Sequence, residues 1–297
     1  MSVKLNVKTA LIKCAMAILF SQTAFANELL HLNFNDSNNL GKQNVGLPIG
    51  VLSGDAKVSQ GYPGSIEFGP AGGLVRIPSF NSPRGSFSVE ARFLIRNYGP
   101  ESSRFVADIL NTATWDNGPS QGFAFRVGGS YLYPTLPRDA YKTEAEWVDA
   151  QGDYSHIDRG RLSDCFAEFT MARKDDPLDW KAVYTNRCIE KNTWTHLVGI
   201  WDGTNMRIYL NGANATDKWR IQGLGAEPLL NSVVDAYVGS RTTGEWDPRH
   251  LDGILDYVKV EDGVLSENEI HKRYQDNFVP QLRDSLCRFV RLLDNAE

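Results

Sequence analysis

The chain contains 297 residues, of which 42% are hydrophobic and 23% charged, and its 36 acidic residues outnumber its 31 basic ones, for a net charge of −5. This length is ample for one large domain with a substantial core. Nucleic acid is not an expected partner, because phosphate binding relies on a clustered basic surface that the sequence does not contain.

Residues 1–26 predict a secretory signal peptide. Three lysines precede the apolar run 14–20, and this run is followed by Ala24-Phe25-Ala26, which has the small residues of a signal-peptidase cleavage site. The run is too short to span a bilayer, and no later segment is long and apolar enough to do so. The alternative is an anchor that stays uncleaved. Cleavage before Asn27 would leave 28 basic against 36 acidic residues, a net charge of −8, in a secreted or periplasmic protein.

The first half of the mature chain predicts short strands separated by Gly- and Pro-rich turns. These strands are expected at 29–34, 51–58, 65–68, 74–77, 87–95, 104–110 and 122–127. The strand 87–95 alternates most clearly. One of its faces is expected to meet the core, through Phe87, Val89, Ala91, Phe93 and Ile95.

Residues 128–191 break this rhythm. Aromatic residues are spread among charges and prolines, and only 165–172 has the pattern of a regular strand. Loops of this length are usually functional or disordered, and the aromatic content favours order. We therefore predict a long, ordered insertion at the rim of the domain.

Three cysteines remain once Cys14 leaves with the signal peptide. A bridge between Cys165 and Cys188 could hold the ends of the rim insertion together and contribute roughly 3 kcal/mol by the chain-entropy account. Cys287 would then have no partner within the chain, which could mean an intermolecular bridge, a free thiol or a different pairing. The sequence leaves the three pairings open.

The centre of the predicted sheet is a hairpin. Residues 194–201 and 206–210 each alternate with period two, as strands do. The second strand stops at Asn211-Gly212, a pair that tolerates the positive φ angles of a type I′ turn. On the first strand we expect Trp194 and His196 to face the core.

The last part of the chain predicts two strands and two helical segments. The strands are 236–239 and 253–260, the second with one face formed by Ile254, Asp256, Val258 and Val260. Ser266 and Glu269 form a capping box for a helix over 267–274. Residues 277–297 have apolar positions at helical spacing, so we expect an amphipathic helix that packs back on the domain or, alternatively, docks a partner or a second copy.

Several of these segments resemble a laminin G-like domain of the concanavalin A-like lectin/glucanase superfamily. The family pattern is a Trp-x-His strand, an Asp-Gly turn, an apolar strand ending in Asn-Gly, and a last strand followed by a Leu-Ser-x-x-Glu-Ile helix, which 194–212 and 253–270 match. The resemblance implies an all-β fold, a two-sheet antiparallel jelly-roll sandwich with a short C-terminal helical segment. It would span 27–276, with the insertion 128–191 at its rim.

The resemblance also implies a structural Ca²⁺ near the sandwich edge. Hard cations prefer carboxylate, amide and carbonyl oxygens, and Asp36 and Asp256 stand at positions similar to the family's calcium site. Such an ion would tie the first turn to the last strand. The alternative is that Asp36 caps its own turn and Asp256 pairs with a nearby basic residue.

The sequence contains no recognised catalytic arrangement. Glycosidases of the same superfamily resemble one another in two carboxylates on one strand face, but Glu90 has Ser88 and Arg92 as its same-face neighbours. The Gln-x-His partner of the superfamily's lyases, a Gly-x-Ser-x-Gly elbow and an HExxH helix are also missing. We therefore lean against an enzyme, and keep a polysaccharide-cleaving hydrolase or lyase as the alternative.

For ligand binding, aromatic residues beside polar ones on rim loops are the candidates, because sugar rings stack on aromatic planes while polar groups bind the hydroxyls. They are Trp115, Asp116, Trp147, Tyr154, His156, Trp246 and Asp247. The resulting hypothesis is an exported lectin-like domain that binds a carbohydrate or an extracellular protein. A structural envelope or adhesion protein is the second alternative. A homodimer could form through the C-terminal helix or Cys287.

Overall fold

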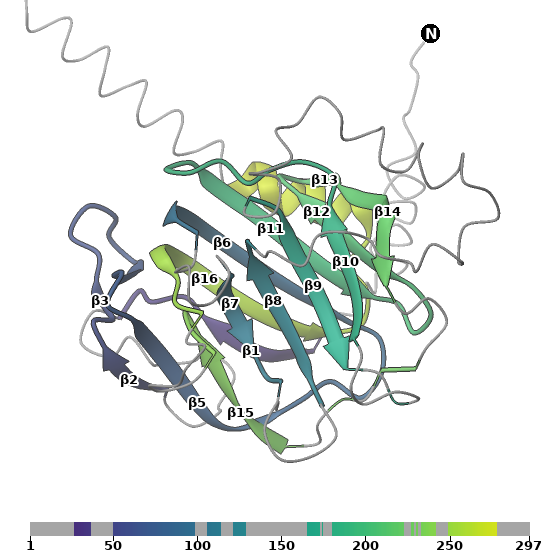
Figure 1. Cartoon of the computed structure of the whole chain (residues 1–297), viewed down its shortest axis with the longest axis horizontal. Helices are drawn as coiled ribbons and strands as arrows, with labels where there is room; N and C mark the ends of the chain where they lie inside the picture. Colours follow the sequence, from purple (N-terminus) through teal and green to yellow (C-terminus); the bar gives the residue numbers. More distant parts are fainter. Residues whose placement is uncertain are drawn as a thin grey trace, which may run out of the picture.

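The computed structural model describes residues 27–36, 50–98, 106–113, 121–128, 165–172, 174, 180–222, 227–228, 230, 233–241 and 249–277. Within these residues the chain forms two antiparallel sheets stacked in two layers (Figure 1). The predicted all-β sandwich is therefore confirmed.

Sheet A consists, in spatial order, of β13 (Ala213–Asn214), β12 (Met206–Leu210), β11 (Trp194–Trp201), β6 (Phe87–Asn97), β16 (Asp252–Asp262), β4 (Ile66–Phe68) and β3 (Lys57–Val58), with β1 (Glu28–Leu32) paired to β16. Sheet B consists of β14 (Thr216–Gln222), β10 (Trp180–Thr185), β9 (Ala167–Ala172), β8 (Phe123–Val127), β7 (Ala107–Asn111), β15 (Val233–Val238), β5 (Gly73–Asn81) and β2 (Val51–Gly54).

The core lies between the sheets and is rich in phenylalanine. The face of β6 predicted to meet it is confirmed, because Phe87, Val89, Ala91, Phe93 and Ile95 are fully buried there. Phe169 of β9 contacts Phe87 and Phe125 edge to face, with ring centroids 5.7 and 6.0 Å away, a geometry that aromatic quadrupoles favour. Gly199 lets β11 approach this cluster, since a Cβ there would lie 2.9 Å from the Phe169 ring.

The central hairpin is confirmed, but its faces are reversed relative to the prediction. Asn211 and Gly212 have the expected positive φ angles of 52° and 76°. Leu197 enters the core, whereas His196 is fully buried on the outer side of sheet A and Trp194 is only partly buried there. The prediction that Trp194 and His196 face the core is therefore wrong.

The helix explains why both faces of β11 are apolar. It spans 267–277 within the described residues and covers the outer side of sheet A, where an apolar cluster forms from Val198, Ile200, Tyr209, Leu265 and Ile270. The predicted capping box begins it: the Ser266 amide donates to Glu269 Oε2 at 2.8 Å, and the Glu269 amide donates to Ser266 Oγ at 3.3 Å.

A β-bulge interrupts β16. Leu255 lies opposite Phe93 and Tyr257 lies opposite Arg92, so Asp256 is an extra residue in the register with β6. Leu255 and Val258 both enter the core. The predicted face with Asp256 and Val258 on one side is therefore wrong, because one inserted residue moves every later side chain to the opposite face.

The remaining differences concern strand boundaries. The predicted strand 51–58 divides at Asp55, where the chain turns, so that β2 and β3 belong to different sheets. β10 and β14 were not predicted. The predicted segment 1–26 lies outside the described residues, and so does the predicted segment 277–297 apart from Asn277, the last described residue of the helix. Within the part that the structure describes, no helix has the length and apolarity needed to cross a membrane.

Candidate functional site

A partly exposed aromatic pair lies on the outer side of sheet A. Tyr62, on the loop between β3 and β4, contacts Trp194 at the start of β11 edge to face, with ring centroids 5.1 Å apart. Tyr62 is 40% exposed. The guanidinium of Arg92 on β6 lies 4.4 Å from the centroid of the Trp194 ring, a cation–π contact that restrains the indole.

The β-bulge places Asp256 beside this pair. Arg92 Nη1 donates to Asp256 Oδ2 at 2.6 Å, and Ser65 Oγ donates to Asp256 Oδ1 at 3.3 Å. The Arg92 side chain is 2% exposed and the Asp256 side chain is 25% exposed. The buried guanidinium therefore orients the Asp256 carboxylate, which stays accessible to a ligand. We call these five residues, Tyr62, Ser65, Arg92, Trp194 and Asp256, the aromatic platform.

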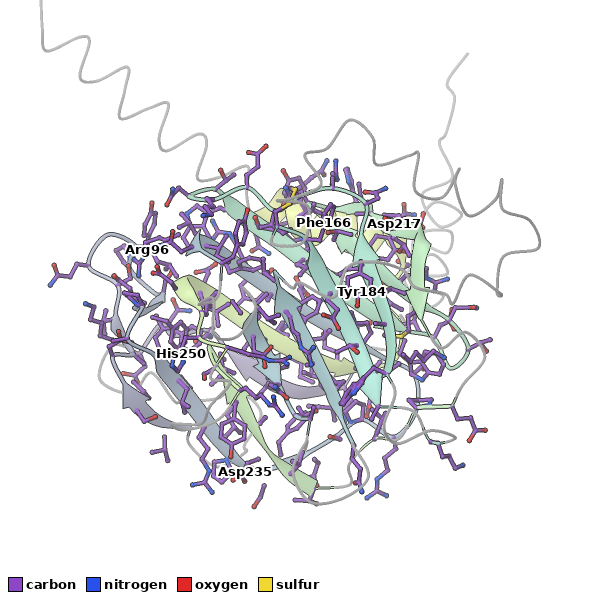
Figure 2. The ribbon with its side chains drawn as sticks, in the orientation of Figure 1. Arg96, Phe166, Tyr184, Asp217, Asp235 and His250 are labelled. Atoms are coloured by element: carbon purple, nitrogen blue, oxygen red, sulfur yellow. A yellow bond between two sulfur atoms is a disulfide. The ribbon has the colours of Figure 1, made fainter. Side chains whose placement is uncertain are left out.

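The backbone under the platform is fixed by a second ion-pair network. Arg96, labelled in Figure 2, donates to Glu67 Oε1 and Asp252 Oδ1 at 2.9 Å each, and to the Phe68 carbonyl at 2.7 Å. Burial alone would lower the pKa of Arg96, but the hydrogen bonds to Asp252 and Glu67 outweigh it and raise that pKa. These contacts tie β4 and β16 to β6.

The geometry around Asp256 bears on the predicted calcium site. One carboxylate oxygen pairs with Arg92, which is the alternative foreseen for this residue. Asn35, next to Asp36, lies against the β3–β4 loop, since a Cβ on Gly64 would lie 2.6 Å from Asn35 Oδ1. No group of three His, Cys, Asp or Glu that could hold a metal occurs in the described ranges. Calcium binding by Asp36 and Asp256 stays a prediction.

A buried polar cluster joins the helix to sheet A. Glu90 Oε1 is 2.9 Å from His196 Nε2 and accepts a hydrogen bond from the Tyr257 hydroxyl at 2.8 Å, while Arg273 Nη1 donates to Glu90 Oε2 at 2.6 Å. Arg273 also pairs with Glu261. The ring of Tyr274 stacks over His196 at 6.0 Å between centroids. The helix therefore covers this cluster and is held by it.

Burial and charge shift the pKa values in this cluster in opposite directions. Burial alone would raise the pKa of Glu90, but hydrogen bonds and charges from His196 and Arg273 outweigh it and lower the pKa to about 2. Burial and the adjacent Glu90 charge raise the pKa of the Tyr257 hydroxyl. Glu90 is thus an ionised acceptor, and Tyr257 stays a neutral donor at ordinary pH.

This shift predicts acid sensitivity. The Glu90 pKa is lower in the folded protein than its ordinary value of 4.5, so its stabilising contribution is fully present above pH 4.5 and is lost as the pH falls toward about 2. In denaturant titrations between these pH values, the wild type should lose on the order of 3 kcal/mol relative to Glu90→Gln. A stability difference between the two proteins that does not change with pH would contradict this assignment.

The outer side of sheet B carries a second row of charged residues. Asp108, Arg126 and Glu168 are register neighbours on β7, β8 and β9. Arg126 Nε lies 3.2 Å from Asp108 Oδ1, and Arg126 Nη1 lies 3.4 Å from Glu168 Oε1. All three residues are buried. The row therefore joins three strands and offers less to a ligand than the partly exposed platform.

The structure describes some of the predicted site residues but not others. The Cys165–Cys188 disulfide is confirmed, with Cα atoms 4.8 Å apart. The seven predicted ligand-binding residues, and Cys287, lie outside the described residues. Their roles stay predictions.

Part of the chain matches the model of a known protein family. Residues 149–271 match the model of the concanavalin A-like lectin/glucanases superfamily. This match confirms the family resemblance. The laminin G-like stretch so identified contains β9 to β16, and with them Trp194 and Asp256 of the platform. No curated protein matches the chain.

Solved structures show the same fold. Domain 4 of an extracellular arabinanase from Geobacillus stearothermophilus, in complex with arabinotriose, is 13% identical with a TM-score of 0.53, over 83% of this chain and 98% of that one. The binding domain of botulinum neurotoxin DC, in complex with SialylT, is 13% identical with a TM-score of 0.53, over 84% of this chain and 51% of that one. The chain thus spans about half of the toxin domain.

Sequence reasoning missed Tyr62 and misplaced Trp194. Tyr62 stands in a Gly- and Pro-rich turn, and nothing in the local pattern links it to a strand more than a hundred residues later. Arg92 was the available signal, because it stands on the outward face of the predicted strand 87–95. An arginine on a strand next to an outward-facing tryptophan is typical of a cation–π pair.

Proposed function

We propose that the protein is an exported carbohydrate-binding domain that holds its ligand on the aromatic platform and does not catalyse a reaction. The observation that carries this proposal is the exposed Tyr62 ring against Trp194, beside an oriented and accessible Asp256 carboxylate. Sugar rings present C–H faces that pack on aromatic rings, and their hydroxyls donate to carboxylates.

Two further observations support this proposal. The arabinanase domain and the toxin binding domain, which share the fold, were each solved in a complex, the first with arabinotriose and the second with SialylT. Export is supported by the N-terminal pattern of residues 1–26 and by the Cys165–Cys188 bridge, since disulfides persist mainly in oxidising compartments.

The buried polar cluster beneath the helix favours a binding function over a catalytic one. Glu90, His196 and Tyr257 are residue types of acid–base catalysis, and His196 and Tyr257 each lie within hydrogen-bond distance of Glu90. They are buried beneath the helix, and Arg273 pairs with Glu90 from that side. In this arrangement the cluster stabilises the helix rather than meeting a substrate.

A glycan array combined with a reducing-end release assay tests the proposal. We expect retention of one or more glycans without release of new reducing ends. Release would support a hydrolase or lyase instead. A result with no retained glycan and no released reducing ends would overturn the proposal and would favour a structural or protein-binding role.

Replacing Tyr62 with alanine should weaken glycan binding at least tenfold, because loss of an aromatic residue that anchors a ligand costs about 2 kcal/mol or more, and about 1.4 kcal/mol corresponds to a tenfold change in affinity. Tyr62→Phe keeps the ring and should bind within about twofold of the wild type. Isothermal titration calorimetry measures both, and an unchanged unfolding midpoint verifies the fold. Equal affinity for Tyr62→Ala and the wild type would remove the platform from the site.

A further inference from the structure

A pocket lies at the far end of β16 from the platform. It has a volume of about 460 Å³ and is bounded by the turn that joins β5 to β6 and by the residues that follow β16. Ligand pockets in proteins begin at about 300 Å³, so a sugar residue fits this space. Asp262 is six residues beyond Asp256, which places the two sites about 20 Å apart along the strand.

The walls of the pocket are fixed by backbone hydrogen bonds. The Gly263 amide donates to the Ser86 carbonyl at 2.8 Å, and the Asp262 amide donates to the Asn27 carbonyl at 2.9 Å. Ser88 Oγ donates to the Gly263 carbonyl at 2.9 Å. The turn 82–86, the end of β16 and Asn27 before β1 therefore form one preorganised frame.

The polar groups of the pocket have unused bonding capacity. Arg84 is exposed and Asp262 is half-buried, and across the described residues neither side chain forms an ion pair. Ser82 is 4% exposed, and its Oγ has no hydrogen-bond partner among the residues that the structure describes. A buried hydroxyl without a partner destabilises the folded state, and a hydrogen bond to a ligand hydroxyl would offset this cost.

We propose that this pocket binds a carboxylate-bearing sugar residue, a uronic acid. The guanidinium of Arg84 suits a carboxylate, to which it can donate two parallel hydrogen bonds. The Asp262 carboxylate can accept hydrogen bonds from ring hydroxyls. Leu29 supplies apolar surface for the ring. The proposal rests on carbohydrate binding in general but on none of the platform residues.

NMR titrations of amide signals with glucuronate, glucose and acetate test this pocket. We expect glucuronate to shift the amides of Arg84, Gly85 and Gly263 at millimolar concentration, with glucose and acetate each at least tenfold weaker. Arg84→Gln should weaken glucuronate binding at least tenfold. Lys272→Gln, which removes an exposed positive charge on the helix, should leave it unchanged.

The outcomes separate this pocket from the platform. Tyr62→Ala should leave glucuronate binding intact even where it abolishes binding at the platform. Shifts of equal size in Arg84→Gln and the wild type would overturn the proposal, as would acetate binding as tightly as glucuronate. Absence of glucuronate shifts at these amides would also overturn it, and would leave the proposed function untouched.

Discussion

Replacing Glu90 with alanine should lower the free energy of unfolding by about 3–5 kcal/mol, the usual cost of removing one partner of a buried ion pair. The substitution leaves Arg273 with Glu261 alone and removes the acceptor that His196 and Tyr257 share. Because Arg273 belongs to the helix, the loss should release the helix from sheet A before the sandwich itself unfolds. Urea denaturation measures the change in stability, and amide hydrogen exchange locates it.

A matched substitution in the same helix provides the control. Asp276 and Lys272 form an exposed i,i+4 pair with a distance of 2.6 Å. Asp276→Ala should change stability by no more than about 0.5 kcal/mol, as expected for a surface pair. If Glu90→Ala were as stable as Asp276→Ala, the buried cluster would not be what holds the helix.

Replacing both Cys165 and Cys188 with alanine should lower the free energy of unfolding by about 3 kcal/mol. The bridge spans 23 positions in sequence, and the Ile189 amide donates to the Cys165 carbonyl beside it. It therefore closes a loop of intermediate length that contains β9 and β10, and restricts the unfolded chain. Thermal and urea denaturation of the oxidised wild type and the double variant measure the difference.

Reduction gives the internal control for this prediction. Dithiothreitol should bring the wild type to the stability of the double variant, and should leave the double variant unchanged. A double variant as stable as the oxidised wild type would show that the bridge contributes nothing to stability.

The sequence predicted those strands in which a single face is apolar. β6 is the clearest case, because Phe87 and its alternate neighbours face the core while Ser88, Glu90 and Arg92 face outward. β11 has apolar residues on both faces because the helix covers the outer one, so alternation could not show which face meets the core. The predicted faces of β16 are wrong beyond Asp256, because one bulged residue reverses the alternation of side chains and leaves no local signal in the sequence.

β10 was missed because its alternation is broken by a charge. Lys181 lies opposite Met171, on the core side of sheet B, where its ammonium group lies 4.0 Å from the centroid of the Trp201 ring. A lysine in a core-facing position looks like a loop residue until its cation–π partner is known. Periodicity alone therefore assigned this strand to the rim insertion.

The platform could be predicted only in part. Asp256 was selected from the family resemblance, but its partner Arg92 and its outward direction depend on the bulge and on strand pairing. Tyr62 meets Trp194 because the β3–β4 hairpin pairs with β16, next to β6 and β11. Such contacts are set by sheet order, which the local pattern of a sequence does not contain.

The most direct test of the account is an NMR titration of the wild-type protein with the glycan that it retains most strongly. We expect the largest changes at the Trp194 indole N–H and at the amides of Tyr62 and Asp256. Saturable changes confined to the outer side of sheet B, with the Trp194 indole signal unmoved, would contradict it.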